Sequence, residues 1–120
     1  MMINIGLLGP GKIAKRVAKG IMLTDNANLY AVGSRDINRA KEFAKGYNAL
    51  AYENEELLED DNVDVVYITV PNAYHFKWVM KALNAGKHVM CEKPMAKTVA
   101  DAKRMVEAAK ESGKKLSIGY

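Results

Sequence analysis

Six short apolar runs alternate with segments of helical periodicity along the 120 residues, and this alternation restricts the possible folds more than any other feature. The run at residues 63–70 is the clearest, because it is β-branched, nearly all apolar and closed by Pro71. A strand without polar alternation is buried on both faces, which is typical of parallel sheets covered by helices. The sequence predicts an α/β fold: a Rossmann-type, doubly wound parallel sheet of about six strands in the order 3-2-1-4-5-6, with helices on both faces.

The same patterns predict where each element begins and ends. Strands are expected over residues 3–8, 29–34, 49–52, 63–70, 88–92 and 116–119. Helices are expected after Gly11 and over residues 37–46, 54–59, 74–85 and 98–113. Asn72 is expected to cap the helix at 74–85, and Thr98 with Asp101 to form a capping box. The expected inward-facing residues of the first two helices are Ile13, Ala14, Val17, Ala18, Ile21, Met22, Ala40, Phe43 and Ala44.

Composition excludes several classes of function. Eighteen basic and fourteen acidic residues give a net charge of +4, and the basic residues are scattered without interleaved aromatics. That pattern does not favour nucleic acid, so a small molecule with several phosphates is the expected anionic partner. The single cysteine, Cys91, excludes an internal disulfide, indicates no metal site and is expected to be a buried strand residue. With no signal-peptide or membrane-spanning pattern, a cytoplasmic protein is expected.

A glycine-rich turn follows the first expected strand. Gly9, Gly11 and Ala14 form the pattern G-x-G-x-x-A, in which Gly9 permits the tight turn and Gly11 lets the backbone approach a pyrophosphate. Lys12 and Ile13 open the next helix, whose free N–H groups would face the anion. The alternative is a strand–helix turn whose glycines serve geometry alone. The position of the turn in a strand–turn–helix unit favours dinucleotide binding.

The end of the second expected strand indicates which dinucleotide. Ser34 and Arg35 stand about where an NAD-preferring site usually carries an acid for the ribose 2′-hydroxyl. A hydroxyl and a guanidinium suit a 2′-phosphate, and Arg39, one helical turn further on, would add charge. Asp36 keeps NAD open as the alternative. The expected cofactor is therefore NADP, or else NAD.

Ligands of such sheets bind beyond the carboxyl ends of the strands, near the switch in strand order. The fourth expected strand ends in Thr69 and Val70 and is closed by Pro71 and Asn72, and His75 lies in the first turn of the next helix. We assign to the cofactor site Thr69, Pro71, Asn72 and His75. The alternatives are that Asn72 is only a helix cap and that His75 is only a helix residue.

Two stretches, TVPNAYH and ALNAGKHVMCEKP, resemble the TPN-x-x-H and ALxAGKHVxxEKP motifs of the Gfo/Idh/MocA family of NAD(P)-dependent oxidoreductases. Relative to the shortest form of the first motif, Val70 is inserted. The resemblance implies that Lys93 is catalytic, beside the nicotinamide and the reacting substrate carbon. It also implies that Glu92 lies near the nicotinamide ribose and that Pro94 fixes the chain, plausibly through a cis bond. The alternative for Lys93 is a solvated lysine paired with Glu92.

The resemblance also implies what accompanies this domain. Residues 1–120 would form the NAD(P)-binding domain of an enzyme acting on a sugar, polyol or related hydroxyl or carbonyl compound. A second domain for substrate binding and dimerisation would be absent from this chain, which alone would turn over little. The full-length protein would be a homo-oligomer without nucleic-acid or membrane partners. Two alternatives remain: a non-catalytic NAD(P)-sensing module, and a Rossmann-type methyltransferase, which would leave the EKP segment unexplained.

Overall fold

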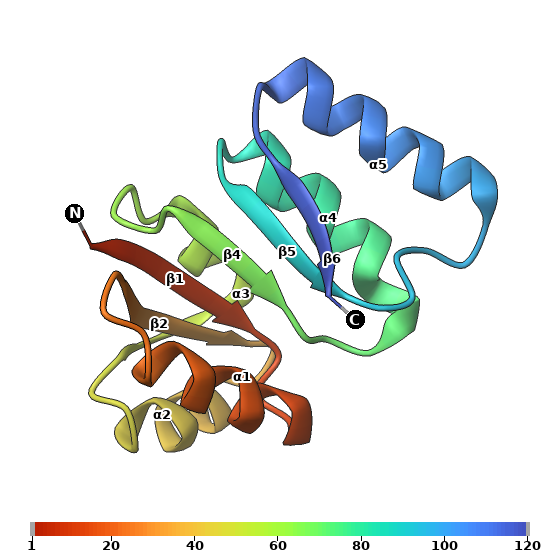
Figure 1. Ribbon diagram of the computed structural model, residues 1–120. Helices are drawn as coiled ribbons and strands as arrows, with labels where there is room; N and C mark the ends of the chain where they lie inside the picture. Colours follow the sequence, from red (N-terminus) through yellow and green to blue (C-terminus); the bar gives the residue numbers. More distant parts are fainter. Residues whose placement is uncertain (1, 120) are drawn as a thin grey trace.

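The structure is a computed structural model that describes residues 2–119. The apolar runs form one parallel sheet in the order β3-β2-β1-β4-β5-β6 (Figure 1). The predicted fold class and strand order are therefore confirmed. Every neighbouring pair is parallel, so each connection must cross the sheet, and helices supply those crossings. The strands are β1 (Ile3–Leu8), β2 (Ala27–Ser34), β3 (Leu50–Glu53), β4 (Val65–Ile68), β5 (His88–Glu92) and β6 (Leu116–Gly119).

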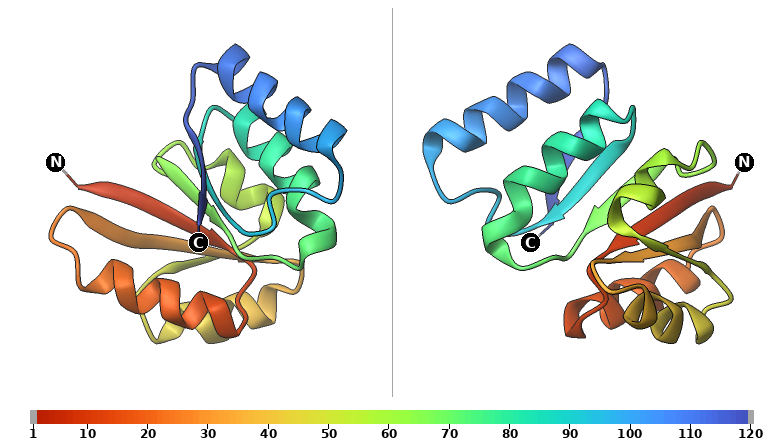
Figure 2. Two further views of the ribbon diagram at one scale, coloured as in Figure 1. Left: turned by 45° about the vertical axis from the view of Figure 1, so that its right-hand side comes forward. Right: turned by 180° about the vertical axis from the view of Figure 1, so that it is seen from behind.

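Helices cover both faces of this sheet, which buries its central strands on both sides (Figures 1 and 2). Small residues of two helices, among them Ala14, Ala18 and Ala40, pack on the face of β1 and β2. Larger residues of the other helices, such as Leu57, Trp78 and Met105, pack on the opposite face. The helices are α1 (Lys12–Met22), α2 (Ile37–Lys45), α3 (Asn54–Glu59), α4 (His75–Asn84) and α5 (Val99–Ser112), with a 3-10 turn, η1, at Asn72–Tyr74.

Several predicted boundaries are wrong by one or two residues. The strand predicted at 63–70 covers only Val65–Ile68. Val63 and Val70 are buried, as apolar strand residues would be, but they lie outside the hydrogen-bonded strand. The strand predicted at 29–34 begins two residues earlier, and the strand predicted at 49–52 lies one residue later. The two helices predicted to end at residues 46 and 113 each end one residue earlier, and Gly46 and Gly113 occupy the C-caps.

Two predictions about helix surfaces and caps also need correction. Asn72 does not cap α4: it is the first residue of η1, which leads directly into α4 behind the rigid Pro71. On α1, Ile13 and Met22 are 44% and 58% exposed, because only the stripe through Ala14, Ala18 and Ile21 faces the sheet. The Thr98 cap is confirmed, since its hydroxyl accepts the Asp101 N–H at 3.1 Å, but within residues 2–119 the Asp101 carboxylate makes no return bond to the Thr98 N–H, so the predicted capping box is only half formed.

A hydrogen-bonded cluster stabilises the chain just before β4. The hydroxyls of Tyr30 and Tyr52 both donate to Oδ2 of Asp60, at 2.9 and 2.8 Å. Burial raises the pKa of the Asp60 carboxyl, but hydrogen bonds from Asn62 N–H and the two tyrosines outweigh burial and leave that pKa below its usual value. The bond to Asp60 is in turn the main reason why the pKa of Tyr52 is raised to about 12.

No helix within residues 2–119 combines the length and the apolar character that crossing a bilayer requires.

Candidate functional site

All six strands run in the same direction, so their carboxyl ends form one edge of the sheet. The glycine turn follows β1 at this edge, Ser34 ends β2, Thr69 follows β4 and Glu92 ends β5. Since β1 and β4 are neighbours and β4 also pairs with β5, the segments after β1, β4 and β5 lie in adjacent positions. The fold therefore gathers the residues that the sequence assigned to a cofactor along a single edge.

Gly9 makes the turn after β1 by lying against the chain that follows β4. Its φ is +93°, and a Cβ built on it would lie 2.8 Å from the backbone nitrogen of Val70. The hydroxyl of Thr69 lies 2.6 Å from the Gly9 carbonyl oxygen and 2.9 Å from that of Leu8, so it donates to this turn. A side chain at position 9 would require both a strained backbone and a displaced neighbour. The tight-turn role predicted for Gly9 follows from this contact.

Gly11 has a different surrounding, although it belongs to the same turn. Within the described residues, no heavy atom lies within 4 Å of a Cβ built on Gly11, so the space above it is open. Gly11 is also the N-cap of α1 and offers no side chain to the first N–H groups of the helix, whose first turn has no acidic residue. Lys12 and Ile13 are exposed beside it. Free N–H groups, open space and a basic neighbour together fit a phosphate group.

At the end of β2, the polar side chains already have defined partners. Ser34 is buried, and its hydroxyl accepts the N–H of Asp36 at 3.1 Å. Asp36 caps α2 by accepting the N–H of Asn38 at 2.9 Å. Arg39 reaches back to the glycine turn, where its Nη2 donates to the Pro10 carbonyl oxygen at 3.1 Å. Arg35 and Asp36 are both exposed, and the cap engages only Oδ1 of Asp36, so a guanidinium and a carboxylate both stand at this corner.

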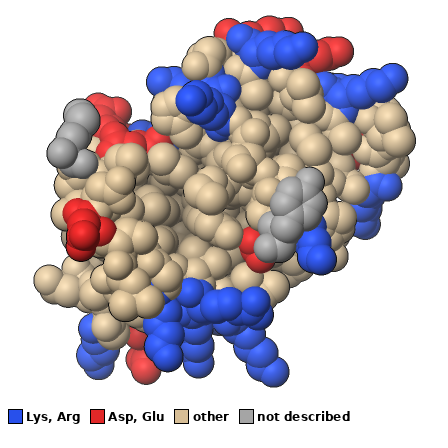
Figure 3. All heavy atoms as spheres, viewed as in Figure 1, with Lys and Arg blue, Asp and Glu red and all other residues tan. Residues whose placement is uncertain are grey.

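Basic side chains gather around the same corner, which the even spread in the sequence did not indicate. Lys12, Lys15, Arg16 and Lys19 are all exposed on α1, a helix that carries no acid. Figure 3 shows a dense basic band along the lower part of the molecule, where α1 and α2 lie in the same view of Figure 1. The expectation of scattered basic residues is therefore wrong for the folded chain. A hollow of about 380 Å³ near Pro10 and Arg39 lies between the two helices.

The segment after β4 divides into an exposed and a buried part. Pro71 and Asn72 are exposed at the edge. His75 is only 1% exposed, and its two ring nitrogens lie 2.7 Å from the carbonyl oxygen of Pro94 and 2.9 Å from that of Val70. Both nitrogens of His75 therefore face the protein's own backbone, so the structure does not direct them toward a ligand.

Lys93 follows β5 directly and is exposed, and the Lys93–Pro94 bond is cis, as the resemblance implied. The Glu92 carboxylate accepts a hydrogen bond of 2.8 Å from the Tyr67 hydroxyl. Burial, together with the Glu92 carboxylate, raises the pKa of Tyr67 to about 12. No ion pair joins Glu92 and Lys93 anywhere in residues 2–119, so the pairing in the alternative interpretation is absent, whereas the exposed lysine that it also assumed is present.

Tyr67 is the residue at this edge that sequence reasoning missed. It was counted within an apolar strand, and the only signal was a hydroxyl-bearing aromatic residue in the otherwise aliphatic stretch VVYI at residues 65–68. The partner Glu92 lies on the next strand, 25 positions away in the chain, so the pair becomes visible only when β4 and β5 are aligned. Cys91, by contrast, is a fully buried strand residue as predicted, and burial is the main cause that raises the pKa of its thiol to about 12.

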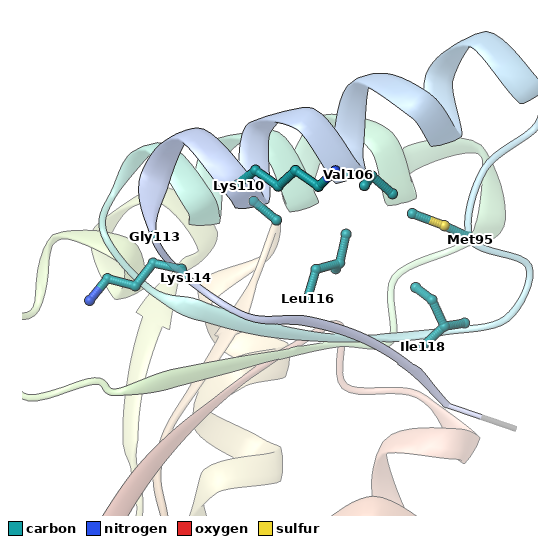
Figure 4. A pocket seen from close by; sticks show the side chains of 8 residues that line it. Met95, Val106, Lys110, Gly113, Lys114, Leu116 and Ile118 are labelled. Atoms are coloured by element: carbon teal, nitrogen blue, oxygen red, sulfur yellow. The ribbon is translucent and has the colours of Figure 1, made fainter.

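A separate hollow of about 450 Å³ opens between α5 and β6 (Figure 4). Its lining includes the apolar side chains of Met95, Leu116 and Ile118, with Lys110 and Lys114 at the same groove. It carries no acid, histidine or cysteine.

Comparisons with known proteins agree with this site. Residues 3–120 match the sequence model of the Gfo/Idh/MocA oxidoreductase family, described as having an NAD-binding Rossmann fold. The chain is 38% identical over 114 residues to scyllo-inositol 2-dehydrogenase (NADP(+)) of Bacillus subtilis, covering 93% of this chain and 35% of that protein. It is 33% identical over 120 residues to myo-inositol 2-dehydrogenase of Thermotoga maritima, covering 98% of this chain and 36% of that protein.

Solved structures show the same similarity in three dimensions. A 3-ketoreductase from Actinomadura kijaniata, in complex with TDP-benzene and NADP, superimposes with a TM-score of 0.94 at 34% identity. That match covers 98% of this chain and 38% of the other, so this chain spans about a third of the length of the relatives it matches. The matched residues and the superimposed fold agree: the chain belongs to the Gfo/Idh/MocA family of oxidoreductases, as its NAD-binding Rossmann domain.

Proposed function

We propose that this chain is the cofactor-binding domain of an enzyme that transfers hydride between NADP, or NAD, and a sugar, polyol or related hydroxyl or carbonyl compound. The observation that supports it most directly is the uncapped N-terminus of α1 above the open space at Gly11, on the same edge as Lys93. A helix N-terminus of this kind fits the pyrophosphate of a dinucleotide. An extended dinucleotide would then reach from the glycine turn past β4 to the end of β5.

NADP is the preferred cofactor in this proposal. Arg35 is exposed and Arg39 lies against the glycine turn, so two guanidinium groups near the end of β2 would be available to a ribose 2′-phosphate. One oxygen of the exposed Asp36 carboxylate, Oδ1, is engaged as the cap of α2, which orients this carboxylate toward its own helix, and NAD stays the alternative. The Ser34 hydroxyl already accepts one hydrogen bond and would donate its own hydrogen to the phosphate.

Lys93 is the catalytic residue of the proposal. The bound nicotinamide would supply or accept the hydride. The Lys93 ammonium would polarise the substrate carbonyl during reduction and stabilise the developing alkoxide during alcohol oxidation. Glu92, fixed by Tyr67, would lie at the nicotinamide ribose. Pro71, Asn72 and Thr69 would line the path between the two ends of the cofactor.

The complete enzyme, in this proposal, adds a substrate-binding and dimerisation domain to this one and works as a homo-oligomer in the cytoplasm, without nucleic acid as a partner. Its support is that the matched relatives are about three times as long and act on inositols and on a nucleotide-linked keto sugar. This chain alone would bind cofactor with little turnover, because hydride transfer requires the substrate carbon to be held against the nicotinamide.

A fluorescence titration with NADPH and NADH tests the cofactor assignment. We expect NADPH to bind this chain at the lower concentration, and Arg35→Ala to weaken NADPH by about tenfold or more while leaving NADH unchanged, because only NADPH loses a charge-assisted contact. Arg104→Ala is the matched control, since Arg104 is an exposed arginine of α5 that lies over the ring of Phe76. Equal affinities, or a preference for NADH, would contradict the NADP assignment.

A further inference from the structure

The residues on both sides of Lys93 are hydrogen-bonded to β4 and to the start of α4. Glu92 precedes Lys93 and Pro94 follows it, and each is hydrogen-bonded to a side chain that belongs to β4 or to the segment after it. The two side chains are Tyr67 and His75, which are eight positions apart in the chain. Neither belongs to the EKP segment itself.

The first attachment comes from one face of the sheet. Tyr67 packs with the core on the α1 side, and its hydroxyl donates to Oε2 of Glu92 at 2.8 Å. The space around this carboxylate is also restricted by β6, because a Cβ built on Gly119 would lie 2.6 Å from the same oxygen. The raised pKa of Tyr67 keeps its hydroxyl protonated, so it donates to Glu92 at every pH at which the enzyme would work.

The second attachment comes from the opposite face. His75 begins α4, whose residues pack with the other core, and its ring is almost completely buried. Nδ1 faces the Pro94 carbonyl and Nε2 faces the Val70 carbonyl, so the ring bridges the chain that follows β5 and the chain that follows β4. Both carbonyls only accept hydrogen bonds, so a neutral ring donates to one of them through its single N–H, and only the imidazolium donates to both; the Pro94 contact is a hydrogen bond when Nδ1 carries the hydrogen.

We propose that Tyr67 and His75 are positioning residues, which hold Lys93 from the two faces of the sheet through Glu92 and Pro94. This inference rests on the proposed catalytic role of Lys93. The lysine side chain is itself exposed and flexible, so its ammonium reaches a productive position reliably only if the backbone beneath it is fixed. One hydrogen bond holds the Glu92 carboxylate and the other the Pro94 carbonyl, so both residues next to Lys93 are restrained.

Turnover measurements on the complete enzyme test the proposal, with Tyr67→Phe and His75→Leu each made alone and in a Lys93→Met background. In the wild-type background, each single substitution is expected to lower kcat by about tenfold while the NADPH Kd changes by less than about twofold. In the Lys93→Met background, neither is expected to lower kcat further, because a residue that acts through Lys93 has no effect once Lys93 is gone.

Two matched comparisons separate positioning from general stability. Tyr52→Phe removes a similar tyrosine–carboxylate bond, the one to Asp60, outside the candidate site, and should leave kcat unchanged. At position 75, His75→Asn places an amide near the position of Nδ1 and so retains the Pro94 contact, whereas His75→Gln places it near Nε2 and retains the Val70 contact. If the Pro94 contact positions Lys93, His75→Asn keeps more of kcat than His75→Gln.

The outcomes are distinct. An unchanged kcat in Tyr67→Phe and His75→Leu, or an equal loss of kcat in the Lys93→Met background, would overturn the positioning role while leaving the proposed function intact. A loss of NADPH affinity as large as the loss of kcat would also overturn the positioning role, and would assign the two residues to cofactor binding. If Lys93→Met itself leaves turnover unchanged, the proposed catalytic function fails first, and this inference fails with it.

Discussion

The glycine turn after β1 and the Glu92–Pro94 segment after β5 occupy the same edge of the sheet but are built in opposite ways. The turn works by having no side chains: Gly9 lies against the backbone of Val70, and Gly11 leaves open space over the uncapped α1. The segment after β5 depends on side chains, because Glu92 is held by Tyr67 and Lys93 projects from the edge. One end thus suits the binding of an anion by backbone N–H groups, and the other suits chemistry by a charged group.

A single strand supports both ends. β4 lies between β1 and β5, and Thr69, directly after it, donates to the glycine turn. Tyr67 within β4 and His75 beyond it hold the segment after β5. Because the two ends are built differently, substitutions at the glycine turn should change NADPH affinity, and substitutions at the segment after β5 should change kcat. Both ends nevertheless depend on the position of β4.

The largest expected effect concerns Lys93, in the segment after β5. Lys93→Met in the complete enzyme should lower kcat by about 10²- to 10³-fold, the loss typical of removing one donor that stabilises developing negative charge. The NADPH Kd, measured by fluorescence, should change by less than about threefold, because phosphate binding depends on the opposite end. Lys97→Met, at an exposed lysine four positions further on, is the control and should retain turnover. Comparable losses in the two variants would return Lys93 to the class of surface lysines.

The next effect separates the two glycines of the turn. Gly9→Ala should lower the free energy of unfolding by about 1–3 kcal/mol or more, because φ is +93° and the new Cβ would press on Val70. Gly11→Ala should change that free energy by less than about 0.5 kcal/mol, yet weaken NADPH binding by about tenfold, because its Cβ enters open space that the pyrophosphate would need.

Urea unfolding and an NADPH titration of both variants provide the check. If Gly11→Ala binds NADPH as tightly as the wild type, the open space at Gly11 is not a phosphate site, and the contrast between the two glycines disappears.

The smallest effect lies at the amino end of β4, away from both ends of the site. The pKa of Asp60 is below its usual value in the folded chain, so its stabilisation is present above the unfolded pKa of about 3.9 and is lost as the pH falls through the folded pKa. Asp60→Asn should therefore lower the free energy of unfolding by about 1–2 kcal/mol at neutral pH, and by progressively less below about pH 4.

Urea unfolding at several pH values measures this difference, with an NADPH titration of the same variant at neutral pH. Asp60 is remote from the carboxyl edge, so cofactor affinity should stay unchanged. A loss of NADPH binding in a folded Asp60→Asn chain would show that the support of β4 and the binding end are coupled, against the separation described above.

Much of the fold could be predicted because it depends on local patterns. Apolar runs, glycine stops and the Thr98 cap identified every strand and helix, with errors of one or two residues at several ends. Some boundary errors arose because a buried residue need not belong to a strand: Val63 and Val70 are buried but lie outside β4. Another error arose because Ile13 has the spacing of an inward-facing helix residue but does not face the sheet. Asn72 was misassigned because the turn after Pro71 tightens into a 3-10 helix, which no residue preference specifies.

By itself, the sequence determined the parallel sheet, the glycine turn, the family and the lysine proposed for chemistry, because each is carried by residues close together in the chain. Only the tertiary structure decided what surrounds them. It turned His75 inward between the Val70 and Pro94 carbonyls, brought Arg39 to the Pro10 carbonyl and paired Tyr67 with Glu92. These arrangements join separate elements, and in a parallel sheet the partners lie on strands that are separated in sequence by whole helices.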